Sequence, residues 1–148
     1  MGLAEFLRRH RRVALDTSIF IYAVEEHPKY VGLAYRVLEW VEHARHSAVT
    51  STLTMTEVLT LPYAQQTKQR VNQYYGLLSR YPNLEWIAPD LEIADLAARF
   101  RASYRLRTPD AIQAATAVRS GVRGFITNDS AFQRVDELEV VLFDELLS

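Results

Sequence analysis

Short apolar runs alternate along the chain with longer segments whose apolar residues recur every three to four positions. The short runs lie at 13–15, 48–51, 84–87, 125–127 and 139–142, and each has the length of a buried strand. Strands that alternate with helices favour a parallel sheet covered on both faces. We therefore predict an α/β fold, namely a three-layer sandwich with a central, mostly parallel sheet of about five short strands flanked by helices. Residues 1–148 are expected to form a single domain.

Helices are predicted between these strands, and several have recognisable ends. The predicted ranges are 2–9, 18–26, 30–45, 54–61, 68–81, 91–106 and 110–120. Asp90 is expected to cap the sixth helix, and Thr108 the seventh with Pro109 at its first helical position. Pro62 should end the fourth helix, because proline lacks the N–H that a helix interior needs. Gly121 should end the seventh.

Composition limits the possible chemistry more than it limits the fold. The chain has no cysteine, which excludes disulfides, zinc thiolate sites and thiol catalysis and fits a cytoplasmic protein. No apolar stretch is long enough to span a membrane. The net charge is −1, yet four arginines lie between residues 8 and 12, and residues 136–148 hold five acids and no base. Any surface for RNA must therefore be a local patch. No phosphate-binding Gly-rich loop is present.

Two acids directly follow predicted strands, and two more lie on predicted helices. Asp16 follows Val13-Ala14-Leu15, and Asp129 follows Phe125-Ile126-Thr127-Asn128. Because ligands of open α/β sheets bind beyond the carboxyl ends of the strands, these two side chains are expected at a site. Glu57 and Asp110 complete a set of four carboxylates that an α/β fold can aim at one point. Such a set, without His or Cys, suits a hard divalent cation such as Mg²⁺.

Each acid also has a simpler interpretation that the sequence leaves open. Asp110 in a first helical turn interacts favourably with the helix dipole, and Asp129 in Asn128-Asp129-Ser130 suits a turn and a cap. For Glu57 the simpler interpretation is a solvent-exposed helix face. Asp16 is harder to explain in this way, because a charge at the edge of the core needs a cation or a hydrogen-bond donor.

Four segments taken together resemble a known family. Leu15-Asp16-Thr17-Ser18, Thr54-Met55-Thr56-Glu57, Thr108-Pro109-Asp110-Ala111-Ile112-Gln113 and Ile126-Thr127-Asn128-Asp129 resemble, in order, the signature segments of PIN-domain nucleases. The separations are similar to those of the small VapC-type toxins. The resemblance implies a PIN-like fold and a magnesium-dependent ribonuclease, with Mn²⁺ as a possible substitute. The residues that match the catalytic metal ligands are Asp16, Glu57, Asp110 and Asp129.

Other residues near these segments receive weaker assignments. Thr17 and Thr127 are expected to add hydroxyl or backbone contacts at the site, and Ser18 to cap the helix that follows. Arg105 and Arg107 precede Asp110, so they either meet substrate phosphate or are solvated cations near a helix end. Tryptophans 40 and 86 are expected in the core or a dimer contact rather than as surfaces for base stacking, and histidines 43 and 46 at an exposed helix end.

The resemblance also implies partners. These are an RNA substrate, a small cognate antitoxin whose terminal segment blocks the acidic site, and a second copy of the chain in a homodimer; no membrane is involved. Two alternatives stay open. One is a housekeeping PIN nuclease without an antitoxin. The other is a catalytically silent PIN-like module that only binds RNA or a protein.

Overall fold

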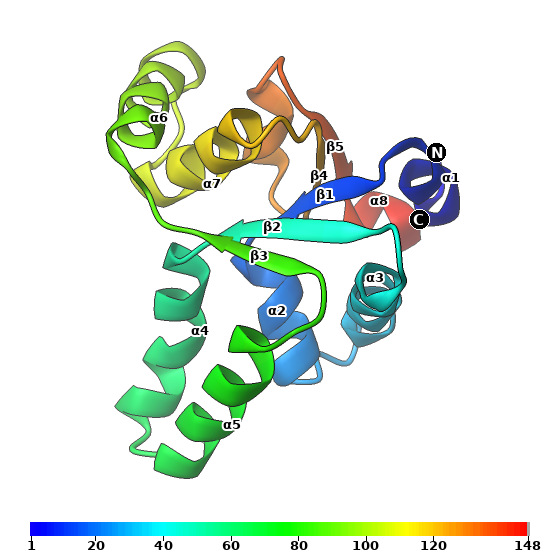
Figure 1. Cartoon of the computed structure of the whole chain (residues 1–148), viewed down its shortest axis with the longest axis vertical. Coiled ribbons are helices and arrows are strands. Elements are labelled where there is room, and N and C mark those ends of the chain that lie inside the picture. The colour runs from blue at the N-terminus through cyan, green and yellow to red at the C-terminus, as the bar shows by residue number, and fades with distance from the viewer. Residues whose placement is uncertain (148) are drawn as a thin grey trace.

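Five parallel strands form the centre of the protein, which a computed structural model describes over residues 1–147 (Figure 1). The strands are β1 (Arg12–Leu15), β2 (Ser47–Ser51), β3 (Leu84–Ile87), β4 (Gly124–Thr127) and β5 (Glu139–Leu142). Their order across the sheet is β3-β2-β1-β4-β5, and every neighbouring pair is parallel. The predicted sheet is therefore confirmed, and it is parallel throughout.

Helices cover both faces of this sheet and enclose two hydrophobic cores (Figure 1). Six helices contribute to the first core: α1 (Leu3–Arg9), α2 (Thr17–Val24), α3 (Val31–Glu42), α4 (Leu53–Ala64), α5 (Lys68–Ser79) and α8 (Phe143–Leu147). The second core lies under α6 (Leu91–Tyr104), α7 (Thr108–Arg119) and the 3₁₀ turn η1 (Ser130–Arg134). The predicted three-layer sandwich is confirmed.

The side chains of β1 point alternately into the two cores, which explains why this strand is apolar at successive positions. Val13 and Leu15 belong to the first core, whereas Ala14 belongs to the second. Successive side chains of a strand point to opposite faces, so a strand buried on both faces needs apolar residues at every position. Within residues 1–147, no helix is both long enough and apolar enough to cross a membrane.

At two helix starts the capping residue differs from the prediction. Helix α7 begins at Thr108, so Arg107 is the capping residue and Pro109 is the second helical position. Proline is tolerated there because the first N–H groups of a helix have no acceptor within it. Helix α2 likewise begins at Thr17, which places Ser18 inside the helix rather than at its cap. The predicted caps at the other ends are confirmed: the Ile93 N–H donates to Asp90 Oδ1 at 2.8 Å, and Gly121 has a φ of 73°.

Helix α4 does not end at Pro62 as predicted but continues to Ala64. Proline removes one backbone hydrogen bond, and here the loss falls in the last turn. The Gln65 N–H still donates to the Leu61 carbonyl at 2.9 Å, while the Pro62 ring is buried. Burial of the ring and the bonds around it thus outweigh one missing donor.

Candidate active site at the carboxyl edge of the sheet

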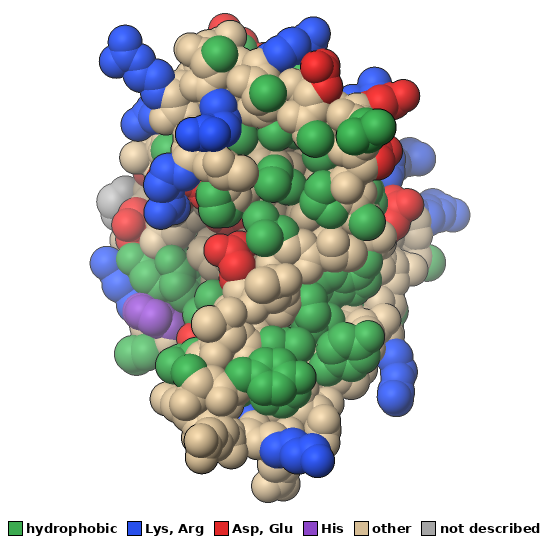
Figure 2. Space-filling view, turned by 90° about the vertical axis from the view of Figure 1, so that its left-hand side faces the viewer, with side chains coloured by type: hydrophobic (Ala, Val, Ile, Leu, Met, Phe, Trp, Pro, Cys, Tyr) green, Lys and Arg blue, Asp and Glu red, His purple; other side chains and the backbone are tan. Residues whose placement is uncertain are grey.

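The strand order brings Asp16 and Asp129 to one edge of the sheet. Asp16 follows β1 directly, and Asp129 lies two residues beyond the end of β4. These strands are neighbours, with β2 and β3 on one side and β5 on the other. The chain therefore reverses its direction across the sheet between β1 and β4, which is where open α/β sheets form binding crevices. Figure 2 looks onto this edge, with acidic side chains near its centre and basic ones above and to the left.

Asp16 is almost completely enclosed, with 8% of its surface exposed. The Ser18 hydroxyl donates to Oδ1 and the Thr127 hydroxyl to Oδ2, each at 2.6 Å. Burial raises the pKa of the Asp16 carboxyl to about 6, and the negative charge of Asp110 adds to that rise against the effect of the hydroxyls. The predicted capping role of Ser18 is wrong, because its hydroxyl binds the carboxylate that precedes α2.

Glu57 reaches the same edge from α4. It is exposed, as the simpler interpretation expects, but the buried Thr17 hydroxyl donates to its Oε1 at 2.6 Å. A buried polar network lies behind this contact. The Gln113 amide donates to Thr54 Oγ1 at 2.8 Å, and Thr54 Oγ1 is 2.7 Å from the Thr50 hydroxyl. The network links α7, α4 and β2 beneath the acids.

Asp110 in the first turn of α7 connects the four acids electrostatically. Partial burial raises the pKa of its carboxyl, and the negative charges of Asp129 and Glu57 raise it further. Arg107 acts in the opposite direction, since its Nε donates to Asp110 Oδ2 at 3.2 Å. Asp110 also contributes to the raised pKa of Asp16. The fold therefore brings all four predicted acids within electrostatic range of one another.

Asp129 caps a helical turn, as its simpler interpretation predicted, and also lies within electrostatic range of Asp110. Its Oδ1 accepts from the Ala131 N–H at 2.9 Å and so caps η1. Its own N–H donates to Thr127 Oγ1 at 3.0 Å. Because the fully buried Thr127 hydroxyl donates in turn to Asp16, one threonine ties the ends of β1 and β4 together.

The weaker assignments fall around these acids. Thr17 and Thr127 direct their hydroxyls at carboxylates, so contact between these threonines and substrate stays a prediction. Arg107 is bound to Asp110 but 77% exposed. Arg105 is exposed at the C-terminal cap of α6 with a φ of 57°, and its carbonyl accepts from Arg134 Nη1 at 3.2 Å. Both arginines border the edge through α7 and the loop before it.

The donor set fits a hard cation in its chemistry. In the arrangement of residues 1–147, no three histidine, aspartate or glutamate side chains converge closely enough to form a ready-made metal cluster. The acids meet hydroxyl, amide and guanidinium donors instead. All potential ligands are oxygens, and burial, with a smaller contribution from neighbouring negative charges, raises the pKa of the Asp16 and Asp110 carboxyls. A divalent cation relieves such crowding, although the ligand assignment itself stays a prediction.

The model of the PIN domain matches residues 13–138, a span that contains all four acids. The chain belongs to the PIN-domain family. The predicted family is therefore confirmed, and the acidic edge is the carboxyl edge of a PIN domain. Comparison with curated protein sequences gave no match.

Several solved structures share this fold, and some of them are described as toxin–antitoxin systems. VapBC-1 of nontypeable Haemophilus influenzae is 22% identical, with a TM-score of 0.68 over 90% of this chain and 98% of that chain. FitAcB of Neisseria gonorrhoeae is 18% identical, with a TM-score of 0.66 over 90% and 99%. Mycobacterium tuberculosis VapC20, described as a sarcin–ricin loop cleaving toxin, is 15% identical, with a TM-score of 0.62 over 76% and 86%. At these identities, the likeness establishes the fold.

Sequence reasoning missed the polar support beneath the acids. Thr54 and Gln113 are 0% and 4% exposed, and neither was expected to contribute to the site. One signal was available: Gln113 is a long polar residue one turn after Asp110, in a helix segment that is otherwise mostly alanine. A polar residue on a buried helix face needs partners, and here they are Thr54 and the Ser51 N–H.

Proposed function

We propose that this PIN-domain protein is a metal-dependent endoribonuclease that hydrolyses RNA phosphodiester bonds at the acidic edge of its sheet. The observation that carries the proposal is the electrostatic coupling of Asp110 to the three other acids at the switch point between β1 and β4. This arrangement suits metal-assisted hydrolysis: within residues 1–147 no hydrogen bond or ion pair joins a histidine to any of the four acids, and the sequence has no cysteine.

Asp16, Glu57, Asp110 and Asp129 are the residues that would hold Mg²⁺ or Mn²⁺. The ion, when bound, supplies an activated water and offsets charge on the phosphate. The protein's own contribution is orientation. Hydroxyls at 2.6 Å fix Asp16 and Glu57, and the Thr17 hydroxyl that binds Glu57 also lies 3.4 Å from Thr54 Oγ1 in the buried threonine–glutamine network. Oriented carboxylates bind a cation without first reorganising.

Arg107 and Arg105 supply positive charge next to the acids. The guanidinium of Arg107 is bound to Asp110 by a single contact and remains largely exposed, so a substrate phosphate can share it. Guanidinium groups match phosphate oxygens in geometry and charge. We propose that these two arginines position the phosphate that is cleaved.

Cleavage of mixed single-stranded and structured RNA tests this function. Wild type should cleave in MgCl₂ or MnCl₂ and not in chelator, and Asp16→Asn and Asp110→Asn should each remove most of the activity while remaining folded. Asp95→Asn is the matched control, because Asp95 is exposed on α6 and away from the strand ends. Full metal-dependent cleavage by both site variants would refute the assignment. A folded wild type that binds RNA without cleaving it would indicate a silent binding module.

The cellular role we propose is that of a toxin in a VapBC-type pair, acting in the cytoplasm. Support comes from the solved structures of this fold, several of which are toxin–antitoxin complexes. The partners would be a small cognate antitoxin that blocks the acidic edge and a second copy of the chain in a homodimer. Hydrophobic side chains stay exposed on α4 and α5 beside this edge (Leu61, Tyr63, Tyr75 and Leu77), as a surface for a protein partner requires.

Growth on expression separates the toxin from a housekeeping nuclease. Expression without a partner should slow growth, and Asp16→Asn at the same soluble level should relieve the effect. Equal growth of wild type, variant and empty vector would favour the housekeeping role. Size-exclusion chromatography with light scattering tests the homodimer.

A further inference from the structure

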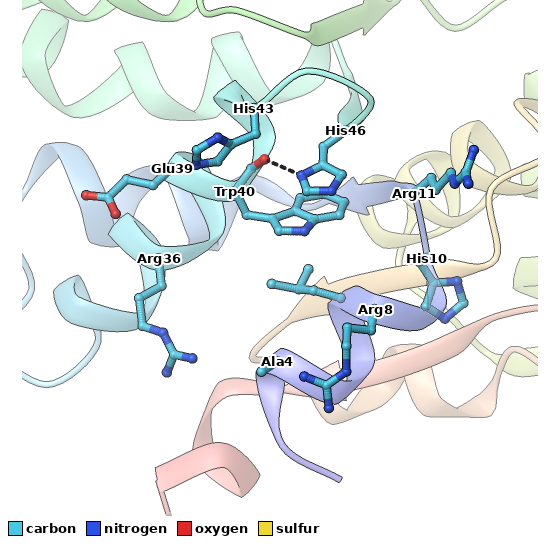
Figure 3. Close-up of a pocket in the computed structure, with 10 residues that line it drawn as sticks. Ala4, Arg8, His10, Arg11, Arg36, Glu39, Trp40, His43 and His46 are labelled. Carbon is cyan, nitrogen blue, oxygen red and sulfur yellow. Dashed lines mark hydrogen bonds between the residues drawn. The ribbon is translucent and has the colours of Figure 1, made fainter.

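A hollow of about 620 Å³ lies at the edge of the sheet opposite to the acids. It is bordered by α1, by α3 and by the residues that lead into β1 and β2 (Figure 3). Arg11 directly precedes β1 and His46 directly precedes β2, so the hollow lies at the amino ends of these strands. The acidic site lies at their carboxyl ends. The two sites are therefore separate, because Arg11 and Asp16 flank β1 and lie about 16 Å apart along the strand.

The fold divides the basic run at residues 8–12 between two roles. Arg9 pairs with Glu139 at 3.0 Å, and Arg12 pairs with Glu85 at 3.1 Å. Arg8 and Arg11 line the hollow instead. Neither side chain forms an ion pair or a hydrogen bond with another of residues 1–147. The paired arginines hold elements together, whereas the guanidinium groups of the other two stay unpaired at the rim of the hollow, with that of Arg11 directed outward (Figure 3).

A third arginine and a single acid complete the charge of the hollow. Arg36 enters from α3 and has no ion pair within the described part of the chain, and Glu39 is the one acid that lines the hollow. Figure 3 shows the guanidinium groups of Arg8 and Arg36 on either side of Ala4. It shows Arg11 at the other end, beyond Trp40 and His46. Arg8 and Arg36 thus form one group of cations and Arg11 alone forms the other, with the Trp40 and His46 rings between them.

The rings between these cations are stacked and fixed. Trp40 and His46 have centroids 4.1 Å apart and planes 13° apart. His46 Nδ1 lies 2.9 Å from the Trp40 carbonyl oxygen, and because a carbonyl only accepts, Nδ1 carries the proton. The Nε2 of a neutral ring is then left as an acceptor. Trp40 was expected in the core or a dimer contact rather than as a surface for base stacking; it is half-buried against the core and also contributes to the wall of the hollow.

We propose that this hollow binds a single-stranded segment of RNA, with phosphates at the two groups of arginines and a nucleoside beside the stacked rings. Guanidinium groups favour phosphate, and rings between cations are a common platform for single strands. A group with one phosphate would occupy only one end, whereas a strand carries phosphates to both. The Nε2 acceptor of His46 matches the donor of a ribose 2′-hydroxyl.

The inference deepens the proposed function and rests on RNA being the substrate of the acidic edge. An RNA that extends beyond its cleavage site would reach the second edge, because the protein is thin along the strands. The hollow then increases the affinity for long RNA without contributing to the chemistry. Loss of the hollow should raise KM for long RNA and leave kcat unchanged.

Binding is tested by fluorescence anisotropy of a labelled mixed-sequence RNA in chelator, where no cleavage occurs. The test variant is R8Q/R11Q/R36Q. The matched control is K68Q/R70Q/R99Q, which removes the same charge from exposed cationic side chains on α5 and α6. The test variant should lose at least tenfold in affinity, and its slope of log K against log salt should fall by about 2, or 0.7 for each single-strand phosphate. The control should lose less than threefold.

Several outcomes would overturn the assignment. An equal loss of RNA affinity in both triple variants would show that binding depends on overall charge and not on the hollow. An unchanged affinity in the test variant would show that the hollow is not a binding site. DNA of the same sequence that binds as tightly, with the same dependence on these arginines, would overturn the choice of RNA. A free mononucleotide that binds as tightly as the strand, or a glutamate-rich peptide that displaces it, would assign the hollow to a different ligand.

Failure of this proposal is distinguishable from failure of the nuclease assignment. If the test variant binds RNA like wild type while wild type cleaves RNA in MgCl₂, only the hollow is refuted. If wild type never cleaves RNA, but the test variant binds RNA more weakly than wild type does, only the nuclease assignment is refuted. Circular dichroism and thermal melts confirm that both triple variants remain folded.

Discussion

Replacing Asp16 by asparagine should stabilise the metal-free protein, and the gain should depend on pH. The Asp16 carboxyl has a pKa of about 6 in the folded protein, against 3.8 for an unperturbed aspartate. Below about pH 4 the group is protonated in both folded and unfolded states, so it contributes nothing. As the pH rises towards 6, the unfolded state releases its proton first, and the free energy of unfolding falls. Above about pH 6 the full destabilisation is present.

The magnitude follows from the difference between the two pKa values. Because one pH unit corresponds to about 1.4 kcal/mol, ionised Asp16 destabilises the fold by roughly 3 kcal/mol. Asparagine keeps one oxygen acceptor, so one of the two hydroxyls that now donate to Asp16 loses its partner at about 1 kcal/mol. The net gain at neutral pH should be about 2 kcal/mol, or roughly 4–8 °C in melting temperature for a chain of this size.

Urea unfolding of wild type and Asp16→Asn between about pH 4 and 8, in chelator and at fixed ionic strength, measures this gain. Because the lost hydrogen bond costs the variant at every pH, its curve should lie slightly below that of wild type at the acidic end, and the two curves should cross as the pH rises. Asp95→Asn should follow wild type within about 0.5 kcal/mol throughout. Mg²⁺ should raise the wild-type curve towards that of the variant. A variant that is no more stable than wild type at pH 8, or a difference independent of pH, would refute the buried and crowded carboxylate.

Three further predictions concern particular contacts. Asp110→Asn should melt at a higher temperature than wild type in chelator and should be stabilised less by MgCl₂. For the full ligand set of wild type, Mg²⁺ at a hundredfold excess over Kd adds about 2.7 kcal/mol to the free energy of unfolding. Equal stabilisation of the two proteins would favour the helix-dipole role of Asp110. Gly124→Ala should lower the free energy of unfolding by about 1–3 kcal/mol, because the new Cβ would lie 2.7 Å from the His10 ring. Denaturant unfolding should show that a second change, His10→Ala, restores most of this loss. If it restores none, the strain lies elsewhere. Thr17→Val removes the hydroxyl that donates a hydrogen bond to Glu57 at 2.6 Å, and it should slow RNA cleavage roughly fivefold to tenfold. Thr17→Ser keeps the hydroxyl and should cleave like wild type. Equal rates for the two variants would show that the hydroxyl does not position Glu57.

Local sequence determined the elements and the chemistry available to them. Apolar runs of three to five residues between turn signals favour buried strands because they are too short for a helix, and the spacing within α3 favours a helix with one apolar face. An acid at the end of such a run, as at Asp16, is placed at a sheet edge by the same logic. These features are encoded within a few residues, so the sheet, the layers and the strand-end positions were predictable. The exact helix starts were not, because capping depends on single dihedral angles.

The tertiary structure decided which strand ends meet and what each acid contacts. Thr127 and Asp16 are 111 residues apart in the chain, yet the order β2-β1-β4 places their oxygens 2.6 Å apart. Periodicity carries no information about such pairings, because it reports which face of an element is buried and not what covers it. The same reason applies at the opposite edge. Arg8 and Arg9 are neighbours in one basic run, but only Arg9 lies beside an acid of β5. Which charge is neutralised and which is left for a ligand is therefore a property of the packed fold.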